Sequence, residues 1–303
     1  MLIAPSDPRE HKLEGCSKKE TDMRRIAGLA LALLLILGGA VPAAARQNSK
    51  HDHHNSTLFA TGQLGTALLA IDVERGTTKV IGPTGQPGSI ALAITRNGRA
   101  AYSIASAVTG FPPGIDGANA QLARIDLATG AATLVGRPMG GNLSVMGMTF
   151  APDGALYGAG DFDPRSPTFN SLYTIDVHTG LATRIGSLGA GVNETDYIMS
   201  FAWDSHGNLY GASMMALYRI HRNRTTNMAT KVVDFVGSSL VMGIAIDEDG
   251  SFYAADLVGP PTLSTIYRVD VKTGLLTPLF NTGIAFVHNI AFKPKGDGQH
   301  DRD

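Results

Sequence analysis

The sequence predicts an all-β fold assembled from a repeated unit of four short strands. The first observation is a recurring Ile-Asp-x-x-Thr-Gly motif, whose copies begin at Ile71, Ile125, Ile175 and Val269, with a degenerate copy at Ile220. Successive copies lie about 50 residues apart, a period typical of four-stranded blades arranged in a ring. The second observation is a matching column of turns between these copies, at Asn97-Gly98, Asp153-Gly154, His206-Gly207 and Asp249-Gly250.

Each recurring motif has a local physical cause. An aspartate at the end of a strand can accept hydrogen bonds from the backbone of the turn that it starts. A glycine adopts the positive φ that lets the next strand run back, and short Asn-Gly and Asp-Gly pairs suit two-residue hairpins. Each period therefore holds four antiparallel strands, which we call A to D, joined by tight A–B and C–D turns.

The ends of the repeat region predict how the ring closes. Leu58-Phe59-Ala60 matches strand B of a unit that has no strand A, whereas Asn289–Pro294 matches a strand A with nothing after it. Joining the two completes a blade and leaves no open sheet edge between the first and last blades. The prediction is a five-bladed β-propeller with blades at 58–82 plus 289–294, 90–136, 147–187, 199–237 and 242–281. We expect a monomer.

The first 45 residues have the features of a secretory signal peptide. Met23-Arg24-Arg25 precedes the apolar run Ile26–Val41, and the small residues Pro42–Ala45 follow it. This order of a basic, an apolar and a small-residue region predicts export with cleavage near Ala45, and Met23 as the true start. The location is then secreted or periplasmic. The alternative is an uncleaved membrane anchor, because Ile26–Ala45 is almost long enough to span a bilayer.

The composition of the chain excludes two classes of function for the exported part, thiol chemistry and nucleic-acid binding. The only cysteine, Cys16, lies in the leader, so the mature chain has no disulfide. The formal net charge of the whole chain is −1, which argues against nucleic acid as a partner. Residues 46–57 form a His-rich linker in which His51, His53 and His54 would bind metal only adventitiously, and 295–303 form a disordered tail.

The Ile-Asp-x-x-Thr-Gly and Asp-Gly-x-Leu-Tyr-Gly-Ala patterns resemble those of exported bacterial β-propeller repeat proteins, the loose group with YVTN, NHL and quinoprotein-like repeats. The resemblance covers about Leu58–Pro294. Its motifs are specific for the fold and uninformative about function, because propellers serve as enzymes, lectins and scaffolds. It therefore implies a ring of blades and no particular reaction.

The predicted topology assigns roles to the two faces of the ring. The A–B and C–D turns share one face and are uniform, whereas the D–A and B–C connections on the other face are irregular, as binding loops on rigid scaffolds are. The start of strand A on this irregular face carries three methionines, which can pack, form an apolar floor or bind a soft metal. The predicted ligand-binding residues are Met146, Met199, Met242, His288, Asn289, Asp116, Phe162 and Tyr197.

Two hypotheses about function follow. The first is an exported, non-catalytic protein that binds a protein, peptide or glycan through the irregular face and needs no cofactor. The second is a Ca²⁺-dependent hydrolase resembling gluconolactonase-like propellers, with its site at the channel mouth. The metal candidates are Asp161, Asp163 and Asp256, and the hypothesis requires Asp161 or Asp163 to converge with Asp256 on Ca²⁺, with His288 or Asp196 to move the proton. A membrane partner is expected only if the leader stays uncleaved.

Overall fold

The computed structural model describes residues 57–294, with gaps at 87, 107, 110–113, 116–119, 140–142, 162–165, 190–196, 239 and 258–261. At 108–109 and 114–115 it describes the backbone alone. The predicted leader, His-rich linker and C-terminal tail thus lie outside the described residues, apart from Thr57. Within the described part of the chain, no helix is long and apolar enough to cross a membrane.

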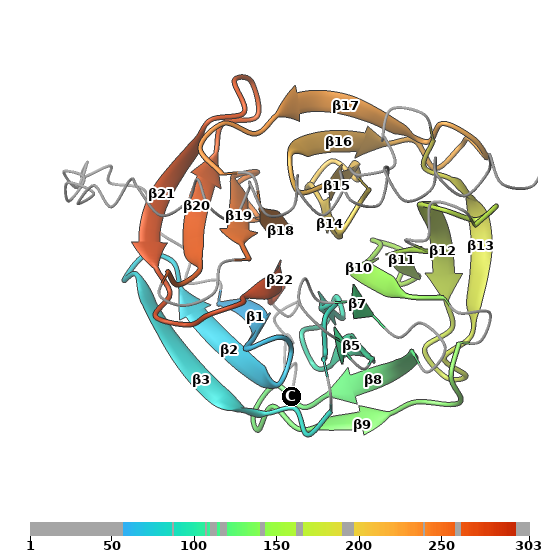
Figure 1. Cartoon of the computed structure of the whole chain (residues 1–303), viewed down its shortest axis with the longest axis horizontal. Helices are drawn as coiled ribbons and strands as arrows, with labels where there is room; N and C mark the ends of the chain where they lie inside the picture. Colours follow the sequence, from blue (N-terminus) through green and yellow to red (C-terminus); the bar gives the residue numbers. More distant parts are fainter. Residues whose placement is uncertain are drawn as a thin grey trace, which may run out of the picture. The chain divides into compact units, whose positions relative to one another are not determined.

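The described residues form five four-stranded antiparallel sheets arranged around a ring (Figure 1), as predicted. Blade one contains β22 (His288–Phe292), β1 (Leu58–Gly62), β2 (Ala67–Asp72) and β3 (Thr77–Pro83). Blade two contains β4 (Ala93–Ile94), β5 (Ala101–Ala105), β8 (Gln121–Ile125) and β9 (Ala132–Leu134). Blade three contains β10 (Val145–Phe150), β11 (Leu156–Gly160), β12 (Ser171–Ile175) and β13 (Ala182–Ser187).

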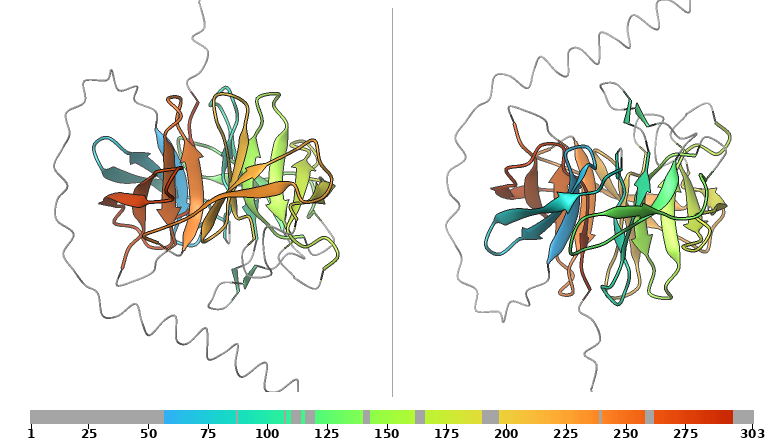
Figure 2. Two further views of the ribbon diagram at one scale, coloured as in Figure 1. Left: turned by 90° about the horizontal axis from the view of Figure 1, so that it is seen from above. Right: turned by 90° about the horizontal axis from the view of Figure 1, so that it is seen from below.

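The last two blades follow in chain order. Blade four contains β14 (Ser200–Trp203), β15 (Leu209–Ala212), β16 (Ala216–Ile220) and β17 (Ala229–Asp234). Blade five contains β18 (Val241–Ile246), β19 (Phe252–Asp256), β20 (Thr265–Val269) and β21 (Leu276–Asn281). One element was not predicted from the sequence: a short hairpin of β6 (Val108–Thr109) and β7 (Gly114–Ile115) between β5 and β8. Figure 2 shows it projecting from one face of the ring.

The C-terminal strand closes the ring as predicted. β22 pairs antiparallel with β1, with Leu58 opposite Phe292 and Ala60 opposite Ile290. The hydroxyl of Thr61 donates to the carbonyl of His288 at 2.8 Å. Blade one is therefore built from the two ends of the described chain, so that this sheet has its complete set of four strands.

The C–D turns form through the aspartates of the repeat. Asp176 Oδ1 accepts from the backbone N–H groups of His178 and Thr179 at 2.8 and 3.0 Å. Gly180, with φ of 74°, then donates its N–H to the carbonyl of Asp176. The same Asp-to-backbone bonds occur in the turns that begin at Asp72, Asp126 and Asp270. The repeated motif therefore folds locally, as its spacing predicts.

The threonine of this motif has a second role, because it contacts a glycine of the preceding blade. A Cβ added at Gly82, Gly136 or Gly186, on or just after the outermost strand of a blade, would collide with the carbonyl of Thr129, Thr179 or Thr225. Each of these threonines belongs to the C–D turn of the following blade. The N–H of Ser187 donates to the Thr225 carbonyl at 3.0 Å. Glycine is thus required because the backbones of adjacent blades touch.

The core lies between the blades. Aromatic pairs in edge-to-face geometry bridge several neighbours: Tyr102–Phe150, Tyr157–Trp203, Tyr210–Phe252 and Tyr253–Phe292, with ring centroids 5.0 to 6.2 Å apart. Such pairs add stabilisation beyond the area that they bury. Side chains of the two inner strands therefore pack each blade against its neighbour.

Candidate functional site

Residues at or just before the start of the innermost strands meet near the axis of the ring. Ile90, Met146, Met199 and Met242 form one buried apolar cluster, in which no side chain is more than 8% exposed. Tyr197, Met214 and Leu257, which belong to connections on the irregular face, pack against it. The structure thus brings the three candidate methionines together, and covers them. We call the buried cluster of Ile90, Met146, Met199 and Met242 the axial plug.

Asn289 ties the axial plug together. Its Nδ2 donates to the carbonyl of Ile90 at 2.9 Å and to that of Met146 at 2.6 Å, and the carbonyl of Met199 lies 3.5 Å away. The residue adopts a φ of 38°, which asparagine tolerates better than most residues. One side chain thus contacts the backbones of blades two, three and four from blade one.

His288 is buried next to this contact. It is 3% exposed, and its Nδ1 lies 3.0 Å from Asn289 Nδ2. The Asn289 amide therefore lies directly against the imidazole ring. Burial lowers the pKa of His288 to about 4, although a hydrogen bond to the Ile90 backbone opposes the shift. His288 is therefore neutral at pH 7 and lies within the ring's core.

The two described metal candidates are held by local hydrogen bonds on different blades. Asp161, directly after β11, accepts from the hydroxyls of Ser166 and Thr168. Asp256, at the end of β19, accepts from the Thr265 N–H and the Tyr267 hydroxyl, both at 2.7 Å. Burial raises the pKa of Asp256. Both carboxylates fasten the B–C connections of their own blades.

The remaining candidates cannot be placed. Asp116, Phe162, Asp163 and Asp196 lie outside the described residues. In the described ranges, no group of three or more His, Cys, Asp or Glu side chains could hold a metal ion. The structure therefore places Asp161, Asp256 and His288 on blades three, five and one without assembling them into a cluster.

The irregular face carries apolar and aromatic side chains around the axial plug. The rings of Phe169 and Tyr197 meet edge to face with centroids 6.2 Å apart. Met214 and Met215 form the turn between β15 and β16, and Met215 is 44% exposed. The hydroxyl of Ser213 accepts from the backbone N–H groups of Met215 and Ala216, which fixes this turn. We call Phe169, Tyr197, Met214, Met215 and Leu257 the apolar platform.

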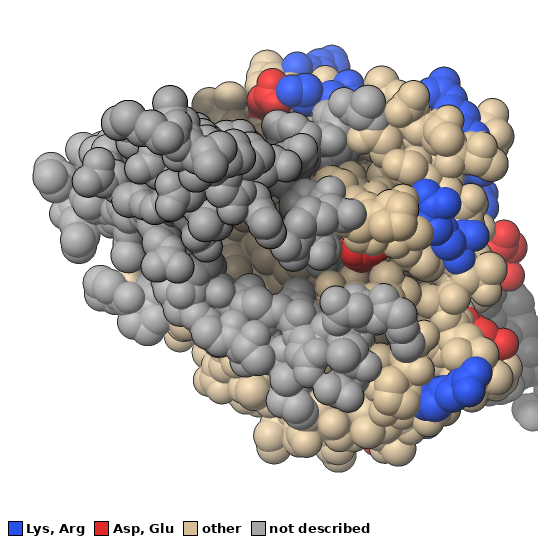
Figure 3. Space-filling model, turned by 45° about the vertical axis from the view of Figure 1, so that its right-hand side comes forward, with Lys and Arg blue, Asp and Glu red and all other residues tan. Residues whose placement is uncertain are grey.

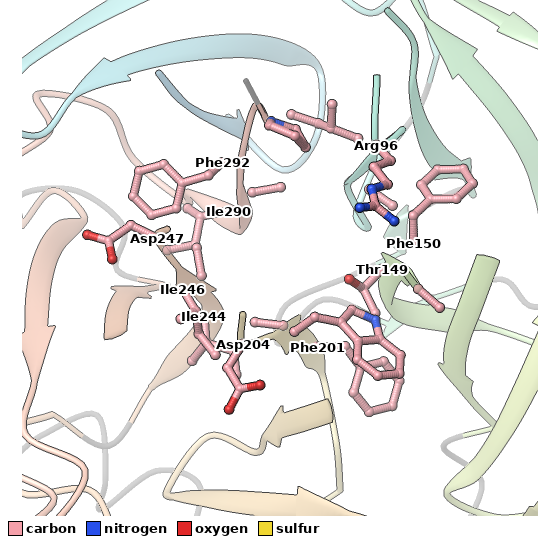
Figure 4. Close-up of a pocket in the computed structure, with 18 of the residues that line it drawn as sticks. Arg96, Thr149, Phe150, Phe201, Asp204, Ile244, Ile246, Asp247, Ile290 and Phe292 are labelled. Carbon is pink, nitrogen blue, oxygen red and sulfur yellow. The ribbon is translucent and has the colours of Figure 1, made fainter. Parts of the chain in front are cut away.

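The opposite face contains a cavity that the sequence did not predict. A cavity of about 460 Å³ is lined by the innermost strands of all five blades and by their A–B turns (Figure 4). Its walls include the small residues Ala93, Ala202, Ala245 and Ala291. Five free strand edges border it, since β4, β10, β14, β18 and β22 are each the first strand of their sheet. We call it the A–B cavity.

Charged residues at the mouth of the A–B cavity segregate by blade. Lys293 on blade one and Arg96 on blade two are cationic, and Asp204 on blade four and Asp247 and Glu248 on blade five are anionic. Figure 4 shows Arg96 on one side of the cavity and Asp204 and Asp247 across from it. The signal was present in the aligned repeats, because each of these residues lies within two positions after strand A. Within any single repeat, however, this charge order is not visible.

No protein-family model matches this chain, and no curated protein matches it either. Among solved structures, nidogen in a nidogen/laminin complex is similar with a TM-score of 0.49 and 12% identity, over 78% of this chain and 98% of that chain. TolB from Acinetobacter baumannii gives 0.46 and 13%, over 79% and 66%. A gluconolactonase from Xanthomonas campestris gives 0.45 and 18%, over 75% and 72%. Likenesses this distant say nothing about function.

Proposed function

We propose that this chain is an exported β-propeller that binds a protein or peptide partner through its irregular face. The observation that carries the proposal is the apolar platform on the irregular face, of which Tyr197, Met214 and Leu257 pack against the buried axial plug. Aromatic and methionine side chains suit the recognition of apolar side chains, because aromatic rings provide large contact areas and the flexible methionine side chain adapts to the shape of its partner.

Surface charge supports a protein or peptide partner rather than a polyanion. Figure 3 shows Lys and Arg dispersed among Asp, Glu and uncharged residues over the described part of the face in view. The formal net charge of −1 agrees with this. A polyanion needs a continuous basic surface, whereas a mixed, nearly neutral surface suits an apolar contact surrounded by polar residues.

The Ca²⁺-dependent hydrolase receives no specific support from the described residues. A general base must reach its substrate, and His288 is 3% exposed with Nδ1 already used by Asn289. Asp161 and Asp256 each have local hydrogen-bond donors. We therefore retain binding as the proposed function of the irregular face.

A peptide-display selection on the immobilised full chain tests the proposal. We expect enrichment of peptides with aromatic or large aliphatic residues. A synthetic peptide with the most enriched sequence should bind saturably in calorimetry. The variant Met215→Glu places a charge on the apolar platform and should weaken binding by about tenfold or more. The matched control is Val80→Glu, which changes an equally exposed residue (47%, against 44% for Met215) on the outer strand β3.

Val80→Glu should leave the affinity unchanged. Failure to enrich any peptide, or equal binding by the wild-type chain and Met215→Glu, would reject the proposal. Export is tested separately by N-terminal sequencing of the mature protein from its native host. We expect the mature chain to begin directly after Ala45, and a retained Ile26–Ala45 segment would instead indicate a membrane anchor.

A further inference from the structure

We infer that the A–B cavity is a second binding site, for a small zwitterionic molecule such as a short peptide with free termini. The site lies on the face opposite the apolar platform and is independent of the proposed function. The arguments are the shape of the cavity, the groups on its wall and the order of charges at its mouth.

The cavity is a blind pocket. At its inner end the Asn289 amide bonds to the carbonyls of Ile90 and Met146, and the axial plug packs beyond them. The cavity volume of about 460 Å³ lies within the range of small-molecule sites. A molecule that enters from the A–B turns therefore stops inside the ring.

The wall offers backbone groups to a ligand. At the middle of the innermost strands the side chains are alanine on four blades, and Thr149 on the fifth. Short side chains bring the inner edges of these strands close to the cavity, where no further strand pairs with them. One of their N–H groups, that of Ile244, is bonded to Ser200 Oγ at 3.0 Å. A free strand edge presents N–H donors and C=O acceptors along its length, and these are the partners that a peptide bond requires.

The charged residues at the mouth can bind the two oppositely charged ends of such a ligand. Lys293 and Arg96 follow the innermost strands of adjacent blades, where they can hold a carboxylate. Arg96 is positioned by a hydrogen bond from Nη1 to the carbonyl of Pro152 at 2.7 Å. The guanidinium has further donors for a carboxylate ligand.

The anionic side is also fixed in place. The side chain of Asp204 is 11% exposed, and its Oδ2 accepts from Asn208 Nδ2 at 2.7 Å. Asp247 Oδ1 accepts from the Ser251 N–H at 2.8 Å, and its Oδ2 from the Tyr253 hydroxyl at 3.2 Å. Both carboxylates are thus held by their own blades and point away from the cavity in Figure 4. The anionic group that an ammonium group can reach is the exposed Glu248, which lines the cavity beside Asp247. A ligand with one positive and one negative end matches this arrangement.

Calorimetric titration of the full chain with L-alanyl-L-alanine and L-alanyl-L-alanyl-L-alanine tests the inference. We expect saturable binding of at least one of them, weakened about fivefold or more in its N-acetylated form and in its C-terminal amide. Arg96→Gln should reduce the difference between the free acid and the amide, because Lys293 alone then holds the carboxylate. Glu248→Gln should reduce the difference between the free amine and the acetylated form.

Two matched controls lie in the same turns but outside the cavity lining. Arg99→Gln and Asp249→Asn change exposed residues of the turns that hold Arg96 and Glu248, and should bind both peptides as the wild-type chain does. No saturable binding of either peptide at millimolar concentration, or equal binding of the free and capped forms, would overturn the inference. Since Met215→Glu lies on the other face, it should leave this binding intact.

Discussion

At the scale of single residues, buried polar groups near the axis and in the B–C connections determine how the protein responds to pH and to mutation. His288 is the clearest case, because its pKa in the folded chain is about 4 against 6.5 for the free side chain. Between these pH values the unfolded chain binds a proton at this residue that the folded chain does not. Stability therefore falls as pH decreases through this window and is fully present above it.

We predict that the contribution of His288 to pH dependence amounts to about 3 kcal/mol between pH 6.5 and 4. The variant His288→Gln has no titrating group at this position, so its free energy of unfolding should change less between pH 6.5 and 4 than that of the wild-type chain. Urea denaturation at a series of pH values measures the difference. Parallel pH profiles for the two proteins would show that His288 is not buried as a neutral group.

Asp256 gives a second prediction at this scale. Its carboxylate accepts from the hydroxyl of Tyr267, a residue that is 9% exposed. Asp256→Ala should destabilise the fold by roughly 1–3 kcal/mol, because the hydroxyl and the Thr265 N–H lose their acceptor. Asp249→Ala, in an exposed turn of the same blade, is the control and should change stability little. A similar loss in both variants would contradict the role assigned to Asp256.

At the scale of elements, the hairpins and their order could be predicted from sequence, because Asp176, Gly180 and their repeats act within a few residues. The roles of Gly186 and Asn289 could not. Gly186 is required by the carbonyl of Thr225 on the next blade, and Asn289 by carbonyls at Ile90 and Met146. These partners are distant in sequence, and no local pattern indicates them.

The contact between blades makes a testable difference among glycines. Gly186→Ala forces a Cβ against the backbone of the next blade and should cost roughly 1–3 kcal/mol, with slightly displaced blades. Gly207, with φ of 76°, has nothing near its missing Cβ. Gly207→Ala should therefore cost only the backbone strain, roughly 1–2 kcal/mol. Thermal unfolding of the two variants should therefore show the larger loss of stability in Gly186→Ala, and a larger loss in Gly207→Ala would contradict the contact between blades.

At the scale of the whole molecule, ring closure and the two faces follow from one strand. β22 completes blade one, supplies His288 and Asn289 to the axis, and is followed by Lys293 at the mouth of the A–B cavity. Ending the chain after Val287 should expose the edge of β1 and abolish cooperative unfolding or cause aggregation. Ending it after Pro294 should leave the melting temperature unchanged. A stable, monomeric chain that lacks β22 would contradict the closure.

Each site is built from a few residues of several blades, so its location, unlike that of the ring, is not visible in any single repeat. The three methionines and Tyr197 could be predicted for the irregular face because they align with strand A or its approach. The charge order of the A–B cavity was missed, because Arg96, Asp204 and Lys293 acquire a common environment only once five blades surround the axis.

Hydrogen exchange, measured by mass spectrometry with and without a selected peptide, tests the binding proposal most directly. We predict slower exchange at 166–170, 197–198, 213–217 and 256–257, which carry the apolar platform, and no change at the A–B turns. Protection confined to the A–B turns or to the outer strands β3, β9, β13, β17 and β21 would contradict the assignment of the irregular face as the partner-binding surface.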